Sequence, residues 1–148
     1  MLMLRSTALM IAAGLALALP SLPAWADDPS AQTTYDEVQS TLGGVPSFVR
    51  LFPKGAVAGA WAEERDLELS NKTALSPKEK ALIGLAVAAQ IPCEYCIWLD
   101  TRSAKSAGAT QEEIAEAVAM AGLTRHWSTF FNGMQIDFGQ FKQELGGD

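Results

Sequence analysis

Four side chains in this 148-residue sequence have the chemistry of a redox or acid–base site. Cys93 and Cys96 are the two cysteines of the chain, and they stand three residues apart in "IPCEYCIWLD". Asp100 follows four residues after the second cysteine, and His126 is the one histidine. Such a pair of cysteines either performs thiol chemistry, forms a structural disulfide or binds a metal.

A helix that begins at Cys93 would suit the pair to redox chemistry. Pro92 ends the apolar segment before it, and the spacing i, i+3 places both sulfurs on one helix face, within reach of a disulfide. First-turn N–H groups and the positive end of the helix dipole favour a thiolate at this position. The residues therefore predict a pair that cycles between dithiol and disulfide.

Three other interpretations of the pair stay open. A structural disulfide that closes so short a loop gains little from loop entropy. Two buried free thiols would suit a reducing compartment better than an oxidising one. A zinc site needs about four ligands, and beyond the pair only Asp100 and His126 are on offer. We predict no metal and no cofactor.

The first 26 residues have the pattern of a secretory signal peptide. Arg5 precedes the apolar run "STALMIAAGLALALP", and "SLPAWA" ends in a small-x-small cleavage signal at Ala24–Ala26. The run is shorter than the roughly 20 residues that span a bilayer. We therefore expect cleavage after Ala26, a mature chain of Asp27–Asp148, and a periplasmic or secreted protein.

The expected mature chain has the size of one domain, and we predict a single domain over residues 27–148. Loss of Arg5 takes the formal net charge from −6 to −7. No basic patch stands out, so nucleic acid is not an expected partner. No later segment is long and apolar enough to span a membrane, so we expect no stable membrane insertion after cleavage.

Helix signals recur along the mature chain. Ser76–Glu79 and Thr110–Glu113 each form a capping box, and Gly108 is placed to end a helix in the left-handed conformation. Ala81–Ile91 is apolar almost all round and is predicted to be the buried centre of the domain. Leu123–Leu145 adds one or two further helices. Because no stretch alternates as a strand would, the predicted class is all-α, with about six to seven helices.

Residues Leu75–Gly122 resemble the core of the carboxymuconolactone decarboxylase and alkylhydroperoxidase AhpD-like family. The resemblance covers the Leu-Ser-Pro helix start, the apolar helix, the C-x-x-C and the Ala-Gly-Ala-Thr hinge before Glu-Glu-Ile. It implies an all-helical domain that assembles as trimers or hexamers. For members with the cysteine pair it also implies peroxiredoxin-like antioxidant activity, in which Cys96 attacks peroxide and Cys93 resolves the sulfenic acid.

The sequence departs from the family pattern at two positions of the proton relay. Peroxidase-type members carry a histidine where this chain has Asp100, and a glutamate where it has Ala81; Glu79 is offset by two residues and points to another face. An anion at Asp100, one turn from Cys96, would raise the pKa of that thiol. Asp100 could instead be protonated or act as a general base, or His126 could approach the pair from its own helix.

The expected function is that of an exported thiol oxidoreductase. Its substrate would be a peroxide, or a protein or small-molecule disulfide, and a periplasmic thiol reductant would have to regenerate the dithiol. Tyr95 and Trp98 share one flank of the predicted helix, and three further aromatic residues lie in a later helix: Trp127, Phe130 and Phe131. These aromatic side chains either line an apolar cleft over the sulfurs or belong to the core or a subunit interface. The alternatives are a non-redox helical binding or assembly protein with a structural disulfide, and a lyase similar to the decarboxylase.

Overall fold

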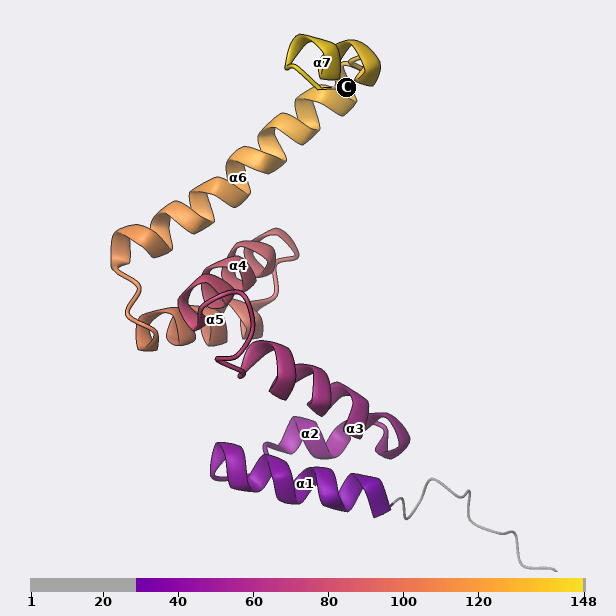
Figure 1. The fold of residues 1–148 in the computed structure, drawn as a ribbon, viewed down its shortest axis with the longest axis vertical. Coiled ribbons are helices and arrows are strands. Elements are labelled where there is room, and N and C mark those ends of the chain that lie inside the picture. The colour runs from indigo at the N-terminus through magenta and orange to yellow at the C-terminus, as the bar shows by residue number, and fades with distance from the viewer. Residues whose placement is uncertain (1–28, 148) are drawn as a thin grey trace, which may run out of the picture. The chain divides into compact units, whose positions relative to one another are not determined.

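The computed structural model describes residues 29–147, and within that range every regular element is a helix. The all-α class predicted above is confirmed. The predicted signal peptide, Met1–Ala26, lies outside the described residues. Figure 1 labels seven α-helices. Together with one π-helix, η2, the elements are α1 (Pro29–Leu42), α2 (Ser47–Leu51), α3 (Lys54–Glu63), η2 (Glu64–Glu68), α4 (Pro77–Gln90), α5 (Glu94–Ser106), α6 (Gln111–Gly133) and α7 (Phe138–Glu144).

The chain forms two compact units, which divide within α3 between Ala58 and Gly59. In the first unit α1 packs on the start of α3 through a small core of Ala31, Tyr35 and Val57. The guanidinium of Arg50, in α2, lies 5.2 Å from the centre of the Tyr35 ring and so covers this core with a cation–π contact. None of the helices in the described range is long and apolar enough to cross a membrane.

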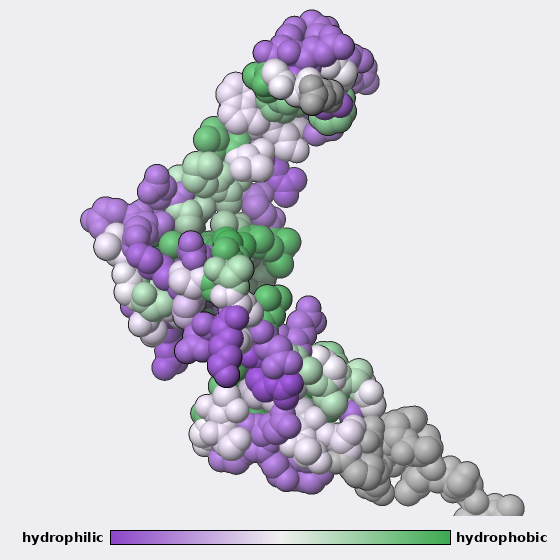
Figure 2. All heavy atoms as spheres, viewed as in Figure 1, coloured by the Kyte–Doolittle hydropathy of each residue, from purple (hydrophilic) through white to green (hydrophobic). Residues whose placement is uncertain are grey.

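In the second unit α4 packs against both α5 and α6 (Figure 1). The core is formed by four buried residues, Ala81, Leu85, Ala104 and Ile114. α4 is therefore central, as predicted, but it is not buried all round. Ile83 and Val87 point away from α5 and α6 and are 52% and 54% exposed. Figure 2 shows hydrophobic side chains gathered at the surface over α4.

The predicted capping signals form as expected. Ser76 Oγ accepts the Glu79 N–H, and the Glu79 carboxylate accepts the Ser76 N–H at 2.7 Å. Thr110 and Glu113 make the same reciprocal pair at the start of α6. Gly108 has φ +83°, the left-handed conformation predicted for it. The four backbone N–H groups in these two capping boxes have no partner within the helix and are hydrogen-bonded by the capping side chains instead. This explains why both helices begin where the sequence indicates.

α6 continues through Gly122 without interruption and ends only at Gly133. The residues from Leu123 onward therefore extend an existing helix and add one short helix, α7, after it. A glycine inside a helix costs about 1 kcal/mol relative to alanine, which is too little to end a helix in the absence of a capping signal.

Lys80 is the one buried cation among the described residues, with 7% of its surface exposed. From α4 its ammonium group donates to the carbonyl oxygens of Leu67 and Ser70, the second at 2.6 Å. Both carbonyls belong to the segment at the end of η2. Lys80 thus ties the π-helix end to the central helix without a carboxylate partner.

The contacts of Lys80 predict a stability difference between two lysines of α4. Lys80→Met leaves two carbonyls without their charged donor and should lower the free energy of unfolding by about 2–3 kcal/mol. Lys78→Met removes a half-exposed ion pair with Glu113 (2.8 Å) and should cost less than about 1 kcal/mol. Urea denaturation of residues 27–148 measures both, and equal losses would contradict the role given to Lys80.

Candidate active site

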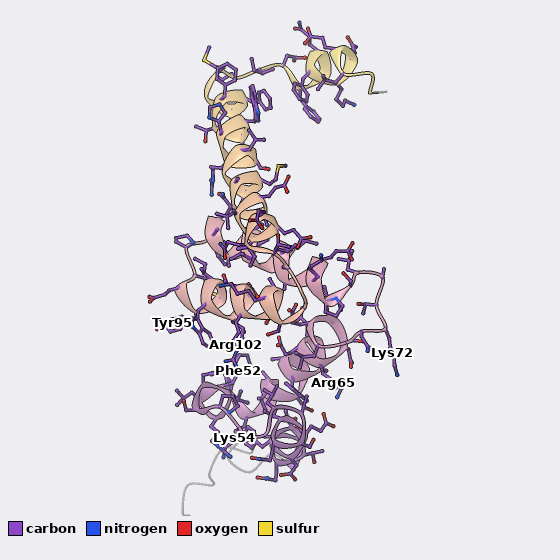
Figure 3. All side chains as sticks on the ribbon, turned by 90° about the vertical axis from the view of Figure 1, so that its left-hand side faces the viewer. Phe52, Lys54, Arg65, Lys72, Tyr95 and Arg102 are labelled. Atoms are coloured by element: carbon purple, nitrogen blue, oxygen red, sulfur yellow. A yellow bond between two sulfur atoms is a disulfide. The ribbon has the colours of Figure 1, made fainter. Side chains whose placement is uncertain are left out.

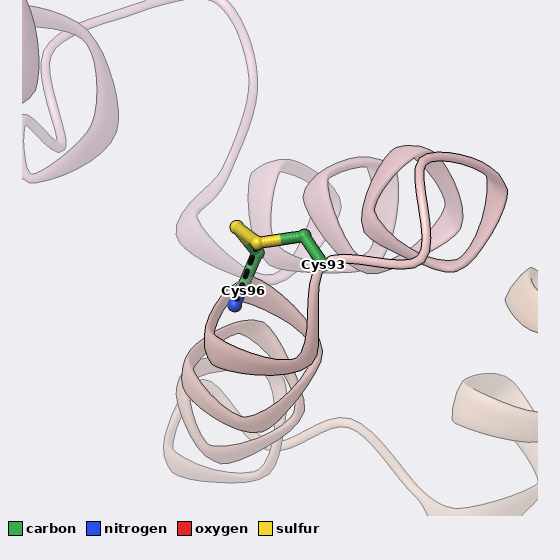
Figure 4. The surroundings of a disulfide bond; sticks show 2 residues. All are labelled: Cys93 and Cys96. Carbon is green, nitrogen blue, oxygen red and sulfur yellow. Dashed lines mark hydrogen bonds between the residues drawn. A yellow bond between two sulfur atoms is a disulfide. The ribbon is translucent and has the colours of Figure 1, made fainter.

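The two cysteines lie at the start of α5 and are joined as a disulfide (Figure 4). Cys93 is the N-cap of the helix, and Cys96 lies in its first turn, with a Cα–Cα distance of 5.3 Å. Both residues are half-buried. The predicted helix start at the first cysteine, and the proximity of the two sulfurs, are thus confirmed.

The Cys93 sulfur takes the place of a capping oxygen. The Cys96 backbone N–H donates to Cys93 Sγ at 3.2 Å, as the dashed line in Figure 4 marks. In the reduced protein the same N–H and the positive end of the helix dipole would stabilise a thiolate on Cys93. The local backbone therefore supports a leaving or attacking thiolate at this position.

Asp100 lies one turn further along α5 and faces α4. A Cβ built on Gly84 would meet Asp100 Oδ2 at 3.0 Å and Cγ at 3.1 Å, so the carboxylate occupies space that only a glycine leaves free. Partial burial raises the pKa of Asp100 above its ordinary value of 3.8, and the charge of Glu68 raises it further. No ion pair to Asp100 is present within residues 29–147, so no lysine or arginine offsets this rise.

Two glutamates of η2 complete a carboxyl cluster around Asp100. Desolvation raises the pKa of Glu64, and the charges of Glu68 and Asp100 raise it further. The acidic segment after α3 therefore contributes to this cluster, because η2 places carboxyl groups within electrostatic reach of Asp100 on α5. Sequence reasoning missed these two residues and Gly84. The one local signal was the run of acidic residues in "AEERDLE".

The relay position at Ala81, and Glu79 two residues before it, have structural roles here. Ala81 is buried in the α4–α5–α6 core, with 1% of its surface exposed. Glu79 is held in the capping box, and its hydrogen bonds to Ser76 lower its pKa. The carboxyl groups that interact electrostatically with Asp100 are instead those of Glu68 and Glu64.

His126 lies on the exposed surface of α6 and not beside the cysteines. Its ring meets the Trp127 ring edge-on, with 5.4 Å between centroids, and the residue is exposed. The described part of the chain contains no contact between His126 and either cysteine. A role for His126 therefore stays a prediction from the sequence alone. No group of three or more histidine, cysteine or acidic side chains within residues 29–147 is placed to hold a metal ion.

The aromatic residues fall into two groups. Tyr95 and Trp98 project from α5 and are 86% and 62% exposed; Figure 3 shows Tyr95 pointing outward from the helix. The second group lies on α6 and α7, where Trp127 stacks on Phe131 with 5.3 Å between centroids and Phe131 meets Phe141 at 5.0 Å. The second group holds α7 against the end of α6.

The comparisons with known proteins agree with this geometry. Residues 55–136, more than half of the chain, match the carboxymuconolactone decarboxylase family. The chain belongs to this family. The matched segment contains η2, the cysteine pair, Asp100 and all of α6, so the family assignment covers the whole candidate site.

A solved structure gives the fold of this carboxymuconolactone decarboxylase family protein independent support. The crystal structure of the alkylhydroperoxidase AhpD core from Rhodospirillum rubrum is similar with a TM-score of 0.66 and 24% sequence identity, over 81% of this chain and 88% of that one. The AhpD-like helical fold predicted from residues 75–122 is therefore confirmed. No curated protein sequence matches the chain.

The carboxyl cluster predicts an unusual pH dependence of stability. Because the pKa of Asp100 is raised on folding, the folded state binds more protons than the unfolded chain between pH 3.8 and its folded-state pKa. Stability should therefore fall as the pH rises through this window. Asp100→Asn removes that loss, so the variant should gain stability over the wild type at pH 7, and the gain should vanish below pH 3.8.

Asp66→Asn is the matched control. Hydrogen bonding to Arg65 lowers the pKa of Asp66, so this variant should lose stability at neutral pH and approach the wild type in acid. Urea denaturation across the pH range measures both variants. The same sign of change for both at pH 7 would contradict the environment assigned to Asp100.

Proposed function

We propose that this protein is an exported thiol oxidoreductase that reduces peroxides through Cys93 and Cys96. The observation that carries the proposal is the disulfide at the start of α5, where the Cys96 N–H donates to Cys93 Sγ. A helix N-terminus favours the thiolate form that such a cycle needs. The Rhodospirillum rubrum structure, described as an alkylhydroperoxidase core, supports a peroxide as the oxidant.

The proposed cycle follows the family order of attack. The Cys96 thiolate attacks the terminal peroxide oxygen, the O–O bond breaks, and the alkoxide leaves as alcohol after taking a proton. Cys96 is now a sulfenic acid; the Cys93 thiolate attacks its sulfur, and hydroxide leaves as water after taking a proton. An external dithiol then reduces the disulfide and is itself oxidised.

Asp100 is the proposed proton donor in this cycle. It lies one helical turn from Cys96, and burial with a neighbouring carboxylate raises its pKa, so its carboxyl holds a proton to higher pH than an exposed aspartate does. A positioned general acid contributes about 10²- to 10⁴-fold in rate. Glu68 and Glu64 of η2 are the proposed route by which Asp100 regains its proton.

Thiol–disulfide exchange is the second candidate function. In exchange the attacking thiolate would be Cys93, whose sulfur already accepts an N–H at the helix start. A reduction potential between about −120 and −270 mV would place the pair among known exchange catalysts, and one below about −300 mV would indicate a structural disulfide.

The rate of thiol loss after addition of peroxide tests the first function. The reduced chain 27–148 should lose thiols at least tenfold faster than a free thiol at the same pH, and Cys96→Ser should abolish the fast phase. Cys93→Ser should keep one fast oxidation and accumulate a sulfenic acid that dimedone traps. Asp100→Asn should slow the reaction at least tenfold. Thiol loss no faster than in free cysteine would refute the peroxidase.

We also propose that the protein assembles from identical copies through α6. Five residues on one face of this helix are spaced alternately three and four apart, and each is about half exposed: Met120, Leu123, Trp127, Phe130 and Met134. This is the spacing of an apolar seam between two helices. Figure 1 shows α6 running on beyond α4 and α5. In its second half Arg125 Nε donates to Gln90 Oε1 of α4 at 2.8 Å, while the five seam residues stay about half exposed.

The seam predicts which substitution reduces the molecular mass. Phe130→Asp places a charge within the seam and should shift the protein toward monomer in sedimentation velocity experiments. Val118→Asp, on the opposite face of the same helix and 41% exposed, should leave the mass unchanged. A monomeric wild type, or an equal effect of the two variants, would refute assembly through this face.

A further inference from the structure

A groove of about 700 Å³ runs along the outer flank of α5, beside the disulfide. Its residues belong to α5 and the turn before it: Pro92, Glu94, Ile97, Trp98, Thr101, Arg102, Lys105 and Ser106. We call this the α5 groove. Neither cysteine lines it, but Pro92 and Ile97 do, and each is the chain neighbour of one cysteine. The groove therefore begins at the turn that carries the redox pair.

Charge is distributed unevenly along the α5 groove. Glu94 lies at the cysteine end, and Arg102 and Lys105 lie two to three turns further along the helix. Neither cation forms an ion pair with a carboxylate within residues 29–147. The Arg102 guanidinium lies 5.4 Å from the centre of the Trp98 ring, which holds it over the apolar part of the groove. Figure 3 shows Arg102 projecting outward from α5.

We infer that the α5 groove binds an apolar molecule with a carboxylate head, such as a single-chain fatty acid or its hydroperoxide. Arg102 and Lys105 would bind the carboxylate, and Ile97, Trp98 and Pro92 would contact the chain. Glu94 repels an anion from the other end, so the apolar chain would point toward the start of α5. At 1.5 Å per residue, Cys93 and Arg102 are about 14 Å apart along the helix, a span that suits an acyl chain.

This inference deepens the proposed function by naming the substrate class. In an acidic protein of net charge −6, two cations without carboxylate partners beside an apolar wall are complementary to an amphipathic anion. Arg102 and Lys105 also lie near the negative C-terminal end of the α5 dipole, where cations stabilise a helix. That role explains their position but not the groove beside them. The experiment must therefore measure recognition of the ligand's charge, and not only the stability of α5.

Calorimetric titration of the oxidised chain 27–148 with octanoate, dodecanoate and hexadecanoate tests the site without any redox step. We expect saturable binding that strengthens with chain length up to the length of the groove. Arg102→Ala and Lys105→Ala should each weaken binding about three- to fivefold, because an exposed ion pair is worth up to about 1 kcal/mol. Methyl dodecanoate should bind more weakly than the acid.

Lys72→Ala is the matched control, since Lys72 is an exposed cation in the loop before α4, away from α5 (Figure 3). It should bind dodecanoate as the wild type does. An equal loss in this variant, equal binding of acid and ester, or no saturable binding would overturn the inference.

Steady-state kinetics tests the α5 groove and the proposed peroxidase function separately. With reduced protein, Arg102→Ala should raise the KM for linoleic acid hydroperoxide about three- to fivefold, leaving kcat and the reaction with cumene hydroperoxide unchanged. Cysteine-dependent turnover of both peroxides with no effect of Arg102 would refute the groove and keep the peroxidase. Carboxylate binding sensitive to Arg102, without turnover of either peroxide, would keep the groove and refute the peroxidase.

Discussion

The arrangement of the candidate site depends on one buried ammonium group. Among the residues that the structure describes Lys80 has no carboxylate partner, and it is satisfied instead by the carbonyl oxygens of Leu67 and Ser70. An unpaired charge inside a protein is costly, so those carbonyls cannot move away without a large penalty. They belong to the end of η2, next to Glu68. The central helix thus fixes the π-helix, and through it a carboxylate that influences Asp100.

Two electrostatic effects act on the cysteine pair in opposite directions. The helix start stabilises a negative charge on Cys93, whose sulfur accepts an N–H. An ionised Asp100, one turn beyond Cys96, would instead destabilise a thiolate on Cys96. The carboxyl cluster moderates this conflict, because burial and mutual repulsion raise the pKa of both Asp100 and Glu64. In the proposed cycle such a site would handle protons with carboxyl groups, where the family pattern has a histidine at the position of Asp100. Its rate should therefore respond to pH over a more acidic range.

Features set by neighbouring residues were predictable from the sequence. The capping boxes, the helix start at Cys93 and the left-handed Gly108 each depend on side chains within a few positions. Lys80, Gly84 and Glu68 were missed because their roles arise where η2 and α5 pack on α4, which a single sequence does not reveal. Gly84 is the clearest example: as part of an apolar helix it appears replaceable, yet a Cβ there would meet the Asp100 carboxylate. The continuation of α6 through Gly122 was missed for a different reason. A glycine without a capping motif rarely ends a helix, because it costs only about 1 kcal/mol relative to alanine.

The same central helix links the site to the proposed assembly. α4 presents Ala81 and Gly84 to its neighbours, and on the opposite flank it exposes Ile83 and Val87. If copies of the chain cover that flank as well as the α6 seam, water is excluded from the helix against which Asp100 lies. Further desolvation raises the pKa of a carboxyl group. Assembly and proton handling would then be coupled, and a variant that dissociates the oligomer should have a lower Asp100 pKa even with every residue of the carboxyl cluster in place.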